Sequence, residues 1–350
     1  MLEDGIEVIR VVPVFGGGKG SSIGRVVKVL GWYLGVLLTL KNRQVSCFNC
    51  HSLPVLPLSV LVKWWKGCVL IYEPHELETE TAGLRGVRQQ VTRVVERMLI
   101  GFVDAICVVN RSIADWYTSV YNIRDVRVVR NVPYRTPAFS ARTGLLRQAI
   151  GLGAESRLFL YQGLLAPGRG IQILIDAFSR LPSDFQLVFM GYGELSDVIK
   201  VAAREYPNIH YISAVPPDVL HHYTVDADVG ISLIEDVCLS YRLCLPNKLF
   251  EYAACGVPSV VSDFPEMGSF VGRYDCGWRI TPTADALVAL LSGLTAEEIA
   301  SKHINALQVS EAFNWQEEEG ALLSMYHDLG FSCPAKHYEV GEQSTGLGMR

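Results

Sequence analysis

The sequence predicts an α/β protein of two domains, each built on a parallel sheet. The chain has 350 residues, which is long enough to form two hydrophobic cores. Short apolar runs rich in β-branched residues alternate with longer helical patterns along the chain, as expected for β-α units. This alternation lapses between residues 134 and 153, where Pro, Ser, Thr and Gly are frequent. We therefore expect one domain in residues 1–140 and a second in residues 141–310.

The expected strands follow one another in chain order. In the first domain they are the runs IEVIRVVPV, VSCFNC, CVLIYE, AICVVN and RVVRNV, and in the second RLFLYQG, QLVFMG, NIHYIS, VGISLI and VPSVVS. Helical patterns occupy the intervals between them. The composition, 49% hydrophobic and 19% charged, is that of a packed globular protein. The polar tail, residues 332–350, is expected to fray.

Charge is distributed unevenly along the chain. Residues 1–140 hold 17 Lys and Arg against 11 Asp and Glu, whereas the remainder holds 14 against 25. A basic half suits an anionic partner such as a membrane surface, with ordinary solvated charge as the alternative. The segments 23–40 and 55–72 are strongly apolar, but both contain lysine, and we expect packed helices rather than membrane spans.

A helix over residues 84–98 would be amphipathic. Leu84, Val87, Val91, Val94 and Met98 would share one face, and Arg85, Arg88, Arg93 and Arg97 would share the other. In the run VKWWKG, two tryptophans lie between Lys63 and Lys66. These patterns are typical of a protein that lies on a membrane surface without crossing it.

The run CFNCHS, residues 47–52, has the spacing of covalent haem attachment. It reads as the end of a strand, which places His51 at the edge where parallel sheets present ligands. Nine cysteines give no even framework and favour a reducing cytosol. Haem attachment needs an oxidising compartment, zinc needs two further ligands, and a redox dithiol would begin a helix. We therefore expect Cys47 and Cys50 to be buried thiols at chance spacing.

The run CLPNKLFEYAACGVPSVVSD, residues 244–263, carries the strongest functional signal. Pro246 suits the first turn of a helix whose free N–H groups attract phosphate, and Lys248 adds a full positive charge there. Glu251 follows on the same helix, where its carboxylate can accept hydrogen bonds from two ribose hydroxyls. Gly256 ends the helix. A phosphate at the tip and a ribose one turn later indicate a site for a nucleoside diphosphate.

Two further loops fit the same ligand. In YQGLLAPGRGIQILIDAF a strand ends at Gly163, and the following loop carries Arg169, whose guanidinium suits a diphosphate. In LVFMGYGE a strand ends with Gly191 and Gly193, which leave room for a nucleotide beside bare backbone. Each loop alone is a weak signal, but together, in this order and in one domain, they are specific.

With these motifs the sequence resembles the GT-B retaining glycosyltransferases of family four, the "group 1" transferases. The matching runs are YEPHELETE, CVVNRSIADWY, VVRNVP, QGLLAPGRGIQILIDAF, LVFMGYGEL, NIHYISAVPPDVLHHYTVDADVGISLI, LPNKLFEYAACGVPSVVSD and FNWQEEE, and they span most of the chain. The resemblance implies two Rossmann-like domains that face each other across a cleft. The second domain would hold the donor and the first the acceptor, and a helix over residues 311–331 would cross back onto the first domain.

The resemblance also implies roles for individual residues. Glu251 would bind the donor ribose, and Arg169 and Lys248 would hold the diphosphate. The implied donor set is completed by Gly163, Gly191, Gly193, Glu194, Val215, Asn247 and Leu249. His51, His75 and Glu76 would face the acceptor, and the implied catalytic set is His75, Glu76, Arg169 and Lys248.

The chain departs from the family pattern in three places. The family often has a glutamate eight positions before the ribose-binding one, where this chain has Leu243, and an arginine after the first glycine of the donor domain, where it has Leu164. The chain also begins almost at a later strand of the family pattern. The first domain would then lack its first strand and leave a sheet edge unpaired.

The predicted function is transfer of a sugar from a UDP- or GDP-linked donor, with retention, to a glycan or lipid-linked saccharide of a surface polysaccharide. Cationic side chains and a helix dipole would stabilise the departing diphosphate, so neither a metal nor a cofactor is expected. We expect a cytoplasmic protein, peripheral on the inner face of the cell membrane, with no nucleic acid partner. The alternatives are a nucleotide-sugar epimerase and a non-catalytic partner that binds nucleotide or a sister transferase.

Overall fold

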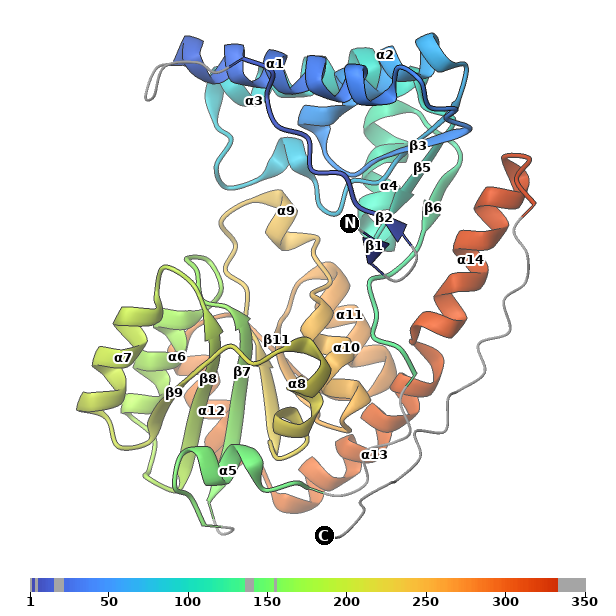
Figure 1. Ribbon diagram of the computed structural model, residues 1–350. Coiled ribbons are helices and arrows are strands. Elements are labelled where there is room, and N and C mark those ends of the chain that lie inside the picture. The colour runs from blue at the N-terminus through green and yellow to red at the C-terminus, as the bar shows by residue number, and fades with distance from the viewer. Residues whose placement is uncertain (1, 4–5, 16–21, 136–141, 154–155, 333–350) are drawn as a thin grey trace, which may run out of the picture.

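The computed structural model describes residues 2–3, 6–15, 22–135, 142–153 and 156–332 and shows two α/β domains, the first above the second in Figure 1. Each domain is built on a parallel sheet, so the predicted fold class is confirmed. Residues 333–350, most of the expected polar tail, lie outside the described residues.

The first domain contains a four-stranded parallel sheet in the order β3-β4-β5-β6. Its strands are β3 (Cys47–Cys50), β4 (Val69–Tyr72), β5 (Ala105–Val108) and β6 (Val126–Val128). Its helices are α1 (Ser22–Leu40), α2 (Leu56–Lys66), α3 (Gly86–Leu99) and α4 (Arg111–Tyr121), with 3-10 turns η1 (Leu53–Val55), η2 (Glu78–Glu80) and η3 (Ile100–Phe102). Helices α2 and α4 cover one face of this sheet through a core that includes Leu56, Tyr72 and Tyr117.

A buried carboxylate lies beside this core. Glu96 of α3 accepts hydrogen bonds from the hydroxyls of Tyr72 at 3.0 Å, Tyr117 at 2.8 Å and Tyr121 at 2.6 Å. Burial raises the pKa of Glu96, and the three hydroxyl donors oppose that rise. The carboxyl group therefore joins α3 to β4 and α4, and the three tyrosine hydroxyls satisfy its hydrogen-bonding capacity.

The start of the chain differs from the sequence-based expectation of a long strand IEVIRVVPV. Its strand is limited to β2 (Ile6–Glu7), which pairs antiparallel with β1 (Leu2–Glu3). Residues 8–15 run irregularly along α1, where the Val14 N–H donates to the Gly31 carbonyl at 3.0 Å. A Cβ at position 31 would lie 2.5 Å from the Phe15 carbonyl oxygen, so the close approach requires glycine. Packing against the helix has thus replaced sheet pairing.

The second domain contains a six-stranded parallel sheet in the order β12-β11-β10-β7-β8-β9. Its strands are β7 (Arg157–Leu164), β8 (Phe185–Tyr192), β9 (Ile209–Ser213), β10 (Val229–Ser232), β11 (Ser259–Ser262) and β12 (Gly277–Ile280). Its helices are α5 (Leu145–Ala149), α6 (Ile171–Ser179), α7 (Ser196–Glu205), α8 (Pro217–Thr224), α9 (Leu239–Arg242), α10 (Asn247–Ala254), α11 (Pro265–Tyr274), α12 (Ala284–Gly293) and α13 (Ala296–Ala312). The strand order reverses between β7 and β10, and ligands of open α/β sheets bind at such a point.

Helix α14 (Trp315–Asp328) joins the two domains, rising beside the first domain in Figure 1. Its Met325 and Leu322 pack with Ile71 and Cys107 on the sheet face opposite α2 and α4. Glu318 accepts from the N–H and the guanidinium of Arg130, at 2.8 Å and 2.9 Å. The last helix therefore completes the core of the first domain.

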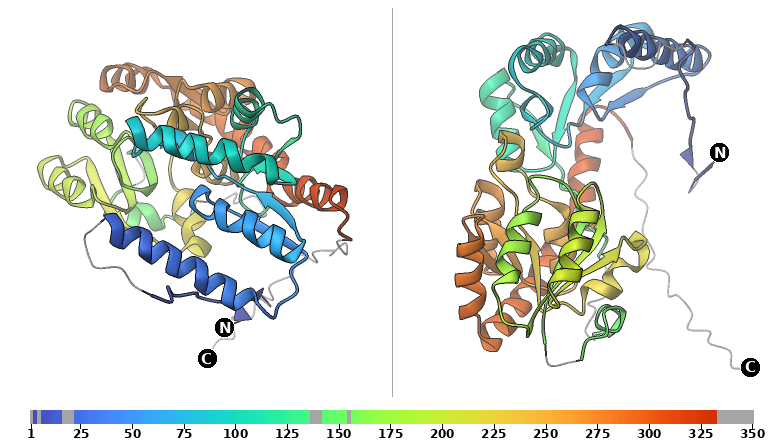
Figure 2. Two further views of the ribbon diagram at one scale, coloured as in Figure 1. Left: turned by 90° about the horizontal axis from the view of Figure 1, so that it is seen from above. Right: turned by 90° about the vertical axis from the view of Figure 1, so that its left-hand side faces the viewer.

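Helices α1, α2 and α3 form the end of the molecule farthest from the second domain, and they lie side by side when seen from above (Figure 2). We call this surface the outer face. Helix α1 is long and apolar enough over residues 23–40 to cross a membrane by length and composition, and only 17% of that window is buried. The expectation of packed helices thus applies to α2, whose Leu58, Val60 and Val62 are buried, and only partly to α1.

Candidate active site

The predicted donor-binding glycines lie at the carboxyl ends of β7 and β8, next to the point where the strand order reverses. Gly163 and Gly191 are paired in register, and a Cβ at Gly191 would lie 1.9 Å from the Gly163 carbonyl oxygen. Gly193 has a φ of 151°, and a Cβ there would lie 2.2 Å from the Leu165 carbonyl oxygen. Glycine is therefore required at both positions, and the two loops present bare backbone at this edge.

Two cations converge on the same edge. Helix α10 begins at Asn247 with no side chain capping its first turn, which leaves N–H groups available to an anion. The ammonium group of Lys248 lies 3.7 Å from the centre of the Tyr161 ring. The guanidinium of Arg169 lies 4.6 Å from the centre of the Tyr241 ring, and its Nε is buried without a hydrogen-bond partner.

The electrostatics of Lys248 are unusual for a lysine. Burial is the main cause that lowers the pKa of Lys248, to about 7, and the positive charge of Arg169 lowers it further. Glu251 opposes this effect, but among the described residues no carboxylate forms an ion pair with Lys248 or Arg169. Two half-buried cations side by side, one with a buried and unsatisfied N–H, create a site that an anion would stabilise.

Glu251 lies one turn into α10 and is held by a partner from β7. Gln162 Nε2 donates to Glu251 Oε2 at 2.6 Å, and Gln162 Oε1 accepts from the Thr224 hydroxyl at 2.8 Å. The Tyr252 hydroxyl in turn accepts from the Gln162 N–H at 3.1 Å. The carboxylate is thus oriented by a fixed amide, as binding of a vicinal diol would require.

Sequence reasoning did not find Gln162, Tyr161 or Tyr241. Gln162 directly precedes Gly163 in the run YQG, so it was next to a recognised position. The two tyrosines read as ordinary apolar residues of a strand and a short helix. Their contacts with Lys248 and Arg169 depend on how β7, α9 and α10 meet, which no local pattern shows.

The remaining residues of the predicted donor set lie less directly at the site. Glu194 and Asn247 are exposed, and Val215 is half-buried against the core beneath α8. The Leu249 side chain is buried in the core, and its N–H donates to the Pro246 carbonyl at 3.1 Å. The Leu249 side chain is therefore not free to contact a donor.

The predicted acceptor residues gather at the carboxyl ends of β3 and β4. The rings of His51 and His75 stack with centroids 5.4 Å apart, and His51 Nδ1 lies 3.0 Å from Glu73 Oε2. Glu76 Oε2 accepts from the Ser240 hydroxyl of α9 at 3.1 Å. Since the next residue, Tyr241, packs on Arg169, helix α9 links the acceptor residues to the donor edge.

Leu164 and Leu243, two of the three departures from the family pattern, also have places in the structure. Leu164 is exposed at the end of β7. Leu243 packs against the core of the first domain, and its carbonyl accepts from Asn110 Nδ2 at 2.9 Å. Position 243 therefore serves the contact between domains and brings no carboxylate to the site.

Asp226 and Asp228 have the Asp-x-Asp spacing by which some enzymes hold a divalent ion between phosphates. They lie before β10, at the opposite edge of the sheet from Lys248. Asp226 accepts from the N–H groups of Gly144 and Leu146, and Asp228 accepts from the Leu158 N–H and pairs with Arg147 at 3.1 Å. Both carboxylates hold α5 and β7 in place.

The cysteine run lies in β3, with Cys47 half-buried and Cys50 buried, and both are free thiols. Burial raises the pKa of Cys47 to about 11 and also raises that of Cys50. Among the described residues no cluster of three metal-ligating side chains occurs. The two thiols are therefore neutral at pH 7 and pack as small apolar groups.

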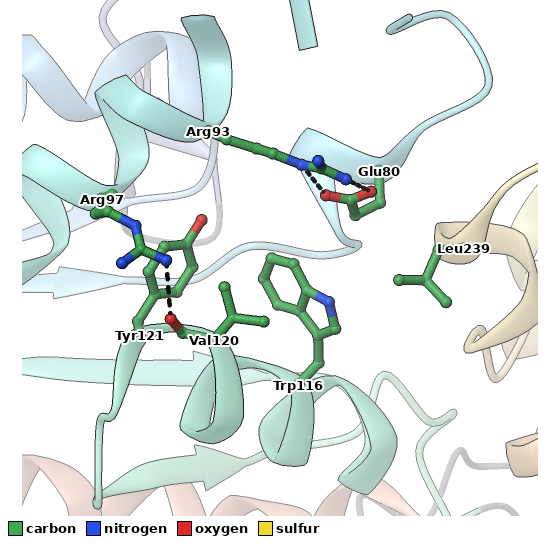
Figure 3. A pocket seen from close by; sticks show the side chains of 7 residues that line it. All are labelled: Glu80, Arg93, Arg97, Trp116, Val120, Tyr121 and Leu239. Atoms are coloured by element: carbon green, nitrogen blue, oxygen red, sulfur yellow. Dashed lines mark hydrogen bonds and ion pairs between the residues drawn. The ribbon is translucent and has the colours of Figure 1, made fainter. Parts of the chain in front are cut away.

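A pocket of about 290 Å³ lies between α3, α4 and α9 (Figure 3). Arg93 makes a bidentate ion pair with Glu80, and Arg97 donates to the Val120 carbonyl at 3.1 Å. Trp116 points into the space between them, and Leu239 of the second domain closes it. The cationic groups here already have protein partners, unlike those at the donor edge.

Comparison with known proteins agrees with this geometry. Residues 144–306, which span the donor edge and most of the second domain, match the sequence profile of the family described as "Glycosyl transferases group 1".

The second domain matches the glycosyl transferases group 1 model over most of its length. A curated protein is also similar to this chain. The D-inositol 3-phosphate glycosyltransferase of Xylanimonas cellulosilytica is 28% identical to it over 208 residues. The alignment covers 56% of this chain and 48% of that protein, so the chain spans about half the length of the curated relative that it matches.

Solved structures show that the likeness in fold, the GT-B architecture, extends over both domains of this chain. Sucrose-phosphate synthase of Thermosynechococcus elongatus has a TM-score of 0.74 at 16% identity, covering 90% of this chain and 82% of that one. HepE of Anabaena in complex with UDP-glucose has a TM-score of 0.69 at 14% identity, covering 88% and 84%. At such identities the likeness concerns the fold.

Proposed function

We propose that this protein transfers a sugar from a UDP- or GDP-linked donor to an acceptor hydroxyl, with retention at the anomeric carbon. The observation that carries the proposal is the pair Arg169 and Lys248, two half-buried cations without a carboxylate partner at the edge where the strand order reverses. A diphosphate would supply the anion that both lack. UDP is the first donor nucleotide to test, because HepE of Anabaena was solved with UDP-glucose.

The chemical step follows from the placement of positive charge. As the bond between the anomeric carbon and the diphosphate breaks, negative charge grows on the leaving phosphate oxygens. Arg169, Lys248 and the first N–H groups of α10 would stabilise that charge without reorganising. The acceptor oxygen bonds to the same face of the anomeric carbon, and its proton passes to the departing phosphate oxygen. Glu251 would hold the ribose and so fix the position of the reacting bond.

The acceptor would approach from the first domain. His75 and Glu76 lie at the boundary between domains, where Ser240 meets Glu76 at 3.1 Å. A carboxylate and an imidazole suit the hydroxyls of a saccharide, which donate and accept hydrogen bonds. A glycan or lipid-linked saccharide of a surface polysaccharide is the acceptor class that the group 1 resemblance and the basic first half favour.

The outer face supports a peripheral position on the inner leaflet of a membrane, and hence a cytoplasmic protein. Val87, Val94 and Met98 of α3 are each more than half exposed, as are Ile23 and Val26 of α1. The exposed arginines Arg88 and Arg97 flank the apolar stripe of α3, an arrangement that suits anionic headgroups. Met98→Asp should reduce co-sedimentation with phosphatidylglycerol vesicles, and equal sedimentation of the variant and the wild type would oppose this position.

Calorimetric titration with UDP, GDP and their sugars tests the donor assignment. Glu251→Ala should weaken nucleotide affinity severely while leaving the fold intact, whereas Glu297→Ala, an exposed glutamate at the start of α13, should change nothing. Unchanged affinity of the Glu251 variant would contradict the ribose assignment. The anomeric configuration of the product, read by NMR, tests retention. Binding without turnover over a panel of saccharide acceptors would favour the non-catalytic partner, and an epimer formed without acceptor would favour the epimerase.

A further inference from the structure

An apolar groove of about 450 Å³ lies on the first domain between the start of α2 and helix α3. We call it the α2–α3 groove. Its apolar walls are Leu53, Pro54, Pro57, Leu84, Val91 and Val95. It lies on the side of α3 that faces α2, whereas the pocket of Figure 3, with Arg93 and Arg97, lies on the side that faces α4. The two flanks of α3 therefore offer different chemistry.

The α2–α3 groove connects two regions described above. At one end Val91 belongs both to the groove and to the exposed apolar stripe of α3 on the outer face. The groove is also lined by Glu76, which meets Ser240 of the second domain. Adjacent Tyr241 packs on Arg169. A molecule lying in the groove would thus extend from the outer face toward the donor edge.

The charged groups in the groove restrict the ligand further. Glu78 lines it and accepts from the Leu53 N–H at 2.8 Å, and burial raises the pKa of Glu78 to about 6. At pH 7 Glu78 is therefore mainly ionised, and Glu76 adds a second carboxyl group to the same lining. A fatty acid or a free phosphate would be repelled there. A chain that ends in neutral hydroxyl groups would instead donate hydrogen bonds to the carboxylates.

We propose that the α2–α3 groove binds the hydrocarbon segment of an acceptor glycolipid, with the saccharide hydroxyls directed toward Glu76. This inference rests on the proposed glycosyl transfer, because it assigns the acceptor of that reaction. The occupant is an alkyl or acyl chain that carries a neutral sugar. Apolar walls bind the chain, the carboxylates select an uncharged head, and continuity with the outer face lets the chain enter from a membrane.

Alkyl glucosides of increasing length are the probe. Hexyl, heptyl and octyl β-glucoside, each below its micelle concentration, are titrated by calorimetry into the full chain without nucleotide, with glucose as the reference. A methylene fully buried on binding should improve affinity about fourfold, so octyl glucoside should bind at least tenfold more tightly than hexyl glucoside. Equal affinities across the series, or no gain over glucose, would overturn the proposal.

Two neighbouring positions on α3 supply the matched variants. Val95→Trp fills the groove and should abolish the dependence on chain length, whereas Val94→Trp changes an exposed valine outside the groove lining and should preserve it. Leu84→Asp, a half-buried position at the groove wall, should weaken octyl glucoside at least tenfold even if Val95→Trp fails to fold. A Val95→Trp or Leu84→Asp variant that folds and keeps wild-type affinity would refute the assignment.

UDP titration of the same variants separates this inference from the proposed function. UDP should bind the Leu84→Asp and Val94→Trp proteins as it binds the wild type, because its site lies in the second domain. UDP binding with no response to alkyl chain length would overturn the groove alone. A response to chain length in a protein that binds no nucleotide would instead overturn the proposed transfer.

Discussion

Replacing Lys248 by methionine should stabilise the ligand-free protein while weakening its affinity for UDP. The side chain is half-buried, its ammonium group lies over the Tyr161 ring beside a second cation, Arg169, and no carboxylate among the described residues is ion-paired with it. Methionine is one atom shorter than lysine, but it is also unbranched and can keep contact with the aromatic ring. The substitution thus removes the charge and retains most of the packing.

The magnitude follows from proton binding. The pKa of Lys248 is lowered from 10.5 to about 7 in the folded protein. Between these two pH values the unfolded chain binds more protons than the folded one, so the stability of the wild type rises with pH across this window. At pH 7 the difference corresponds to a cost of about 4 kcal/mol for the folded state. Methionine should recover about 2–4 kcal/mol of this, which would raise the Tm by about 5–15 °C.

The loss of function should be equally measurable. A charge-assisted contact with a diphosphate is worth about 1.5–3 kcal/mol, so the Kd for UDP should rise about 10- to 100-fold. Thermal melting without ligand and calorimetry with UDP are the two assays. Lys200→Met is the matched control, because Lys200 also lies over a tyrosine ring, at 5.4 Å from the centre of Tyr211, but is solvent-exposed. It should leave both the Tm and the affinity for UDP unchanged.

Two results would refute this reasoning. A Lys248→Met protein that melts below the wild type without nucleotide would show that the ammonium group has a stabilising partner. A Kd for UDP within twofold of the wild type would show that Lys248 does not contact the donor phosphates.

The remaining predictions concern pH, the tyrosine cluster and the thiols. Because neutral Lys248 must gain a proton to bind a diphosphate, the Kd for UDP should rise by up to about tenfold per pH unit above pH 7, and calorimetry on Lys248→Met should show this dependence reduced. Glu96→Ala should lower the free energy of unfolding by about 3 kcal/mol or more, since three tyrosine hydroxyls lose their acceptor, whereas Glu96→Gln should cost less; equal urea midpoints for the two variants would contradict this. Cys47→Ser combined with Cys50→Ser should leave sugar transfer nearly unaltered, and loss of transfer in a folded protein would give these thiols a functional role.

Much of the fold was predictable from sequence because apolar periodicity specifies strands and helices directly. A parallel strand buried on both faces reads as a continuous apolar run, and the alternation of such runs with helical patterns leads to a parallel sheet. The run IEVIRVVPV shows the limit of this rule. Its residues are typical of a strand, yet residues 8–15 run along α1 and do not pair with a sheet edge. They contact the helix at Gly31 and Gly35, where the absence of a side chain allows close approach.

By itself, the sequence determined the pieces of the donor site that lie within one loop or one helix turn. Lys248 and Glu251 share α10, and Arg169 lies in the loop that follows Gly163 at the end of β7, so their spacing alone indicated a phosphate and a ribose. Only the tertiary structure decided what meets them across the chain. Gln162 orients Glu251 although the two residues are 89 positions apart in the sequence. Leu243, from the second domain, packs against the core of the first domain. Such contacts depend on strand order and domain packing, which local periodicity does not encode.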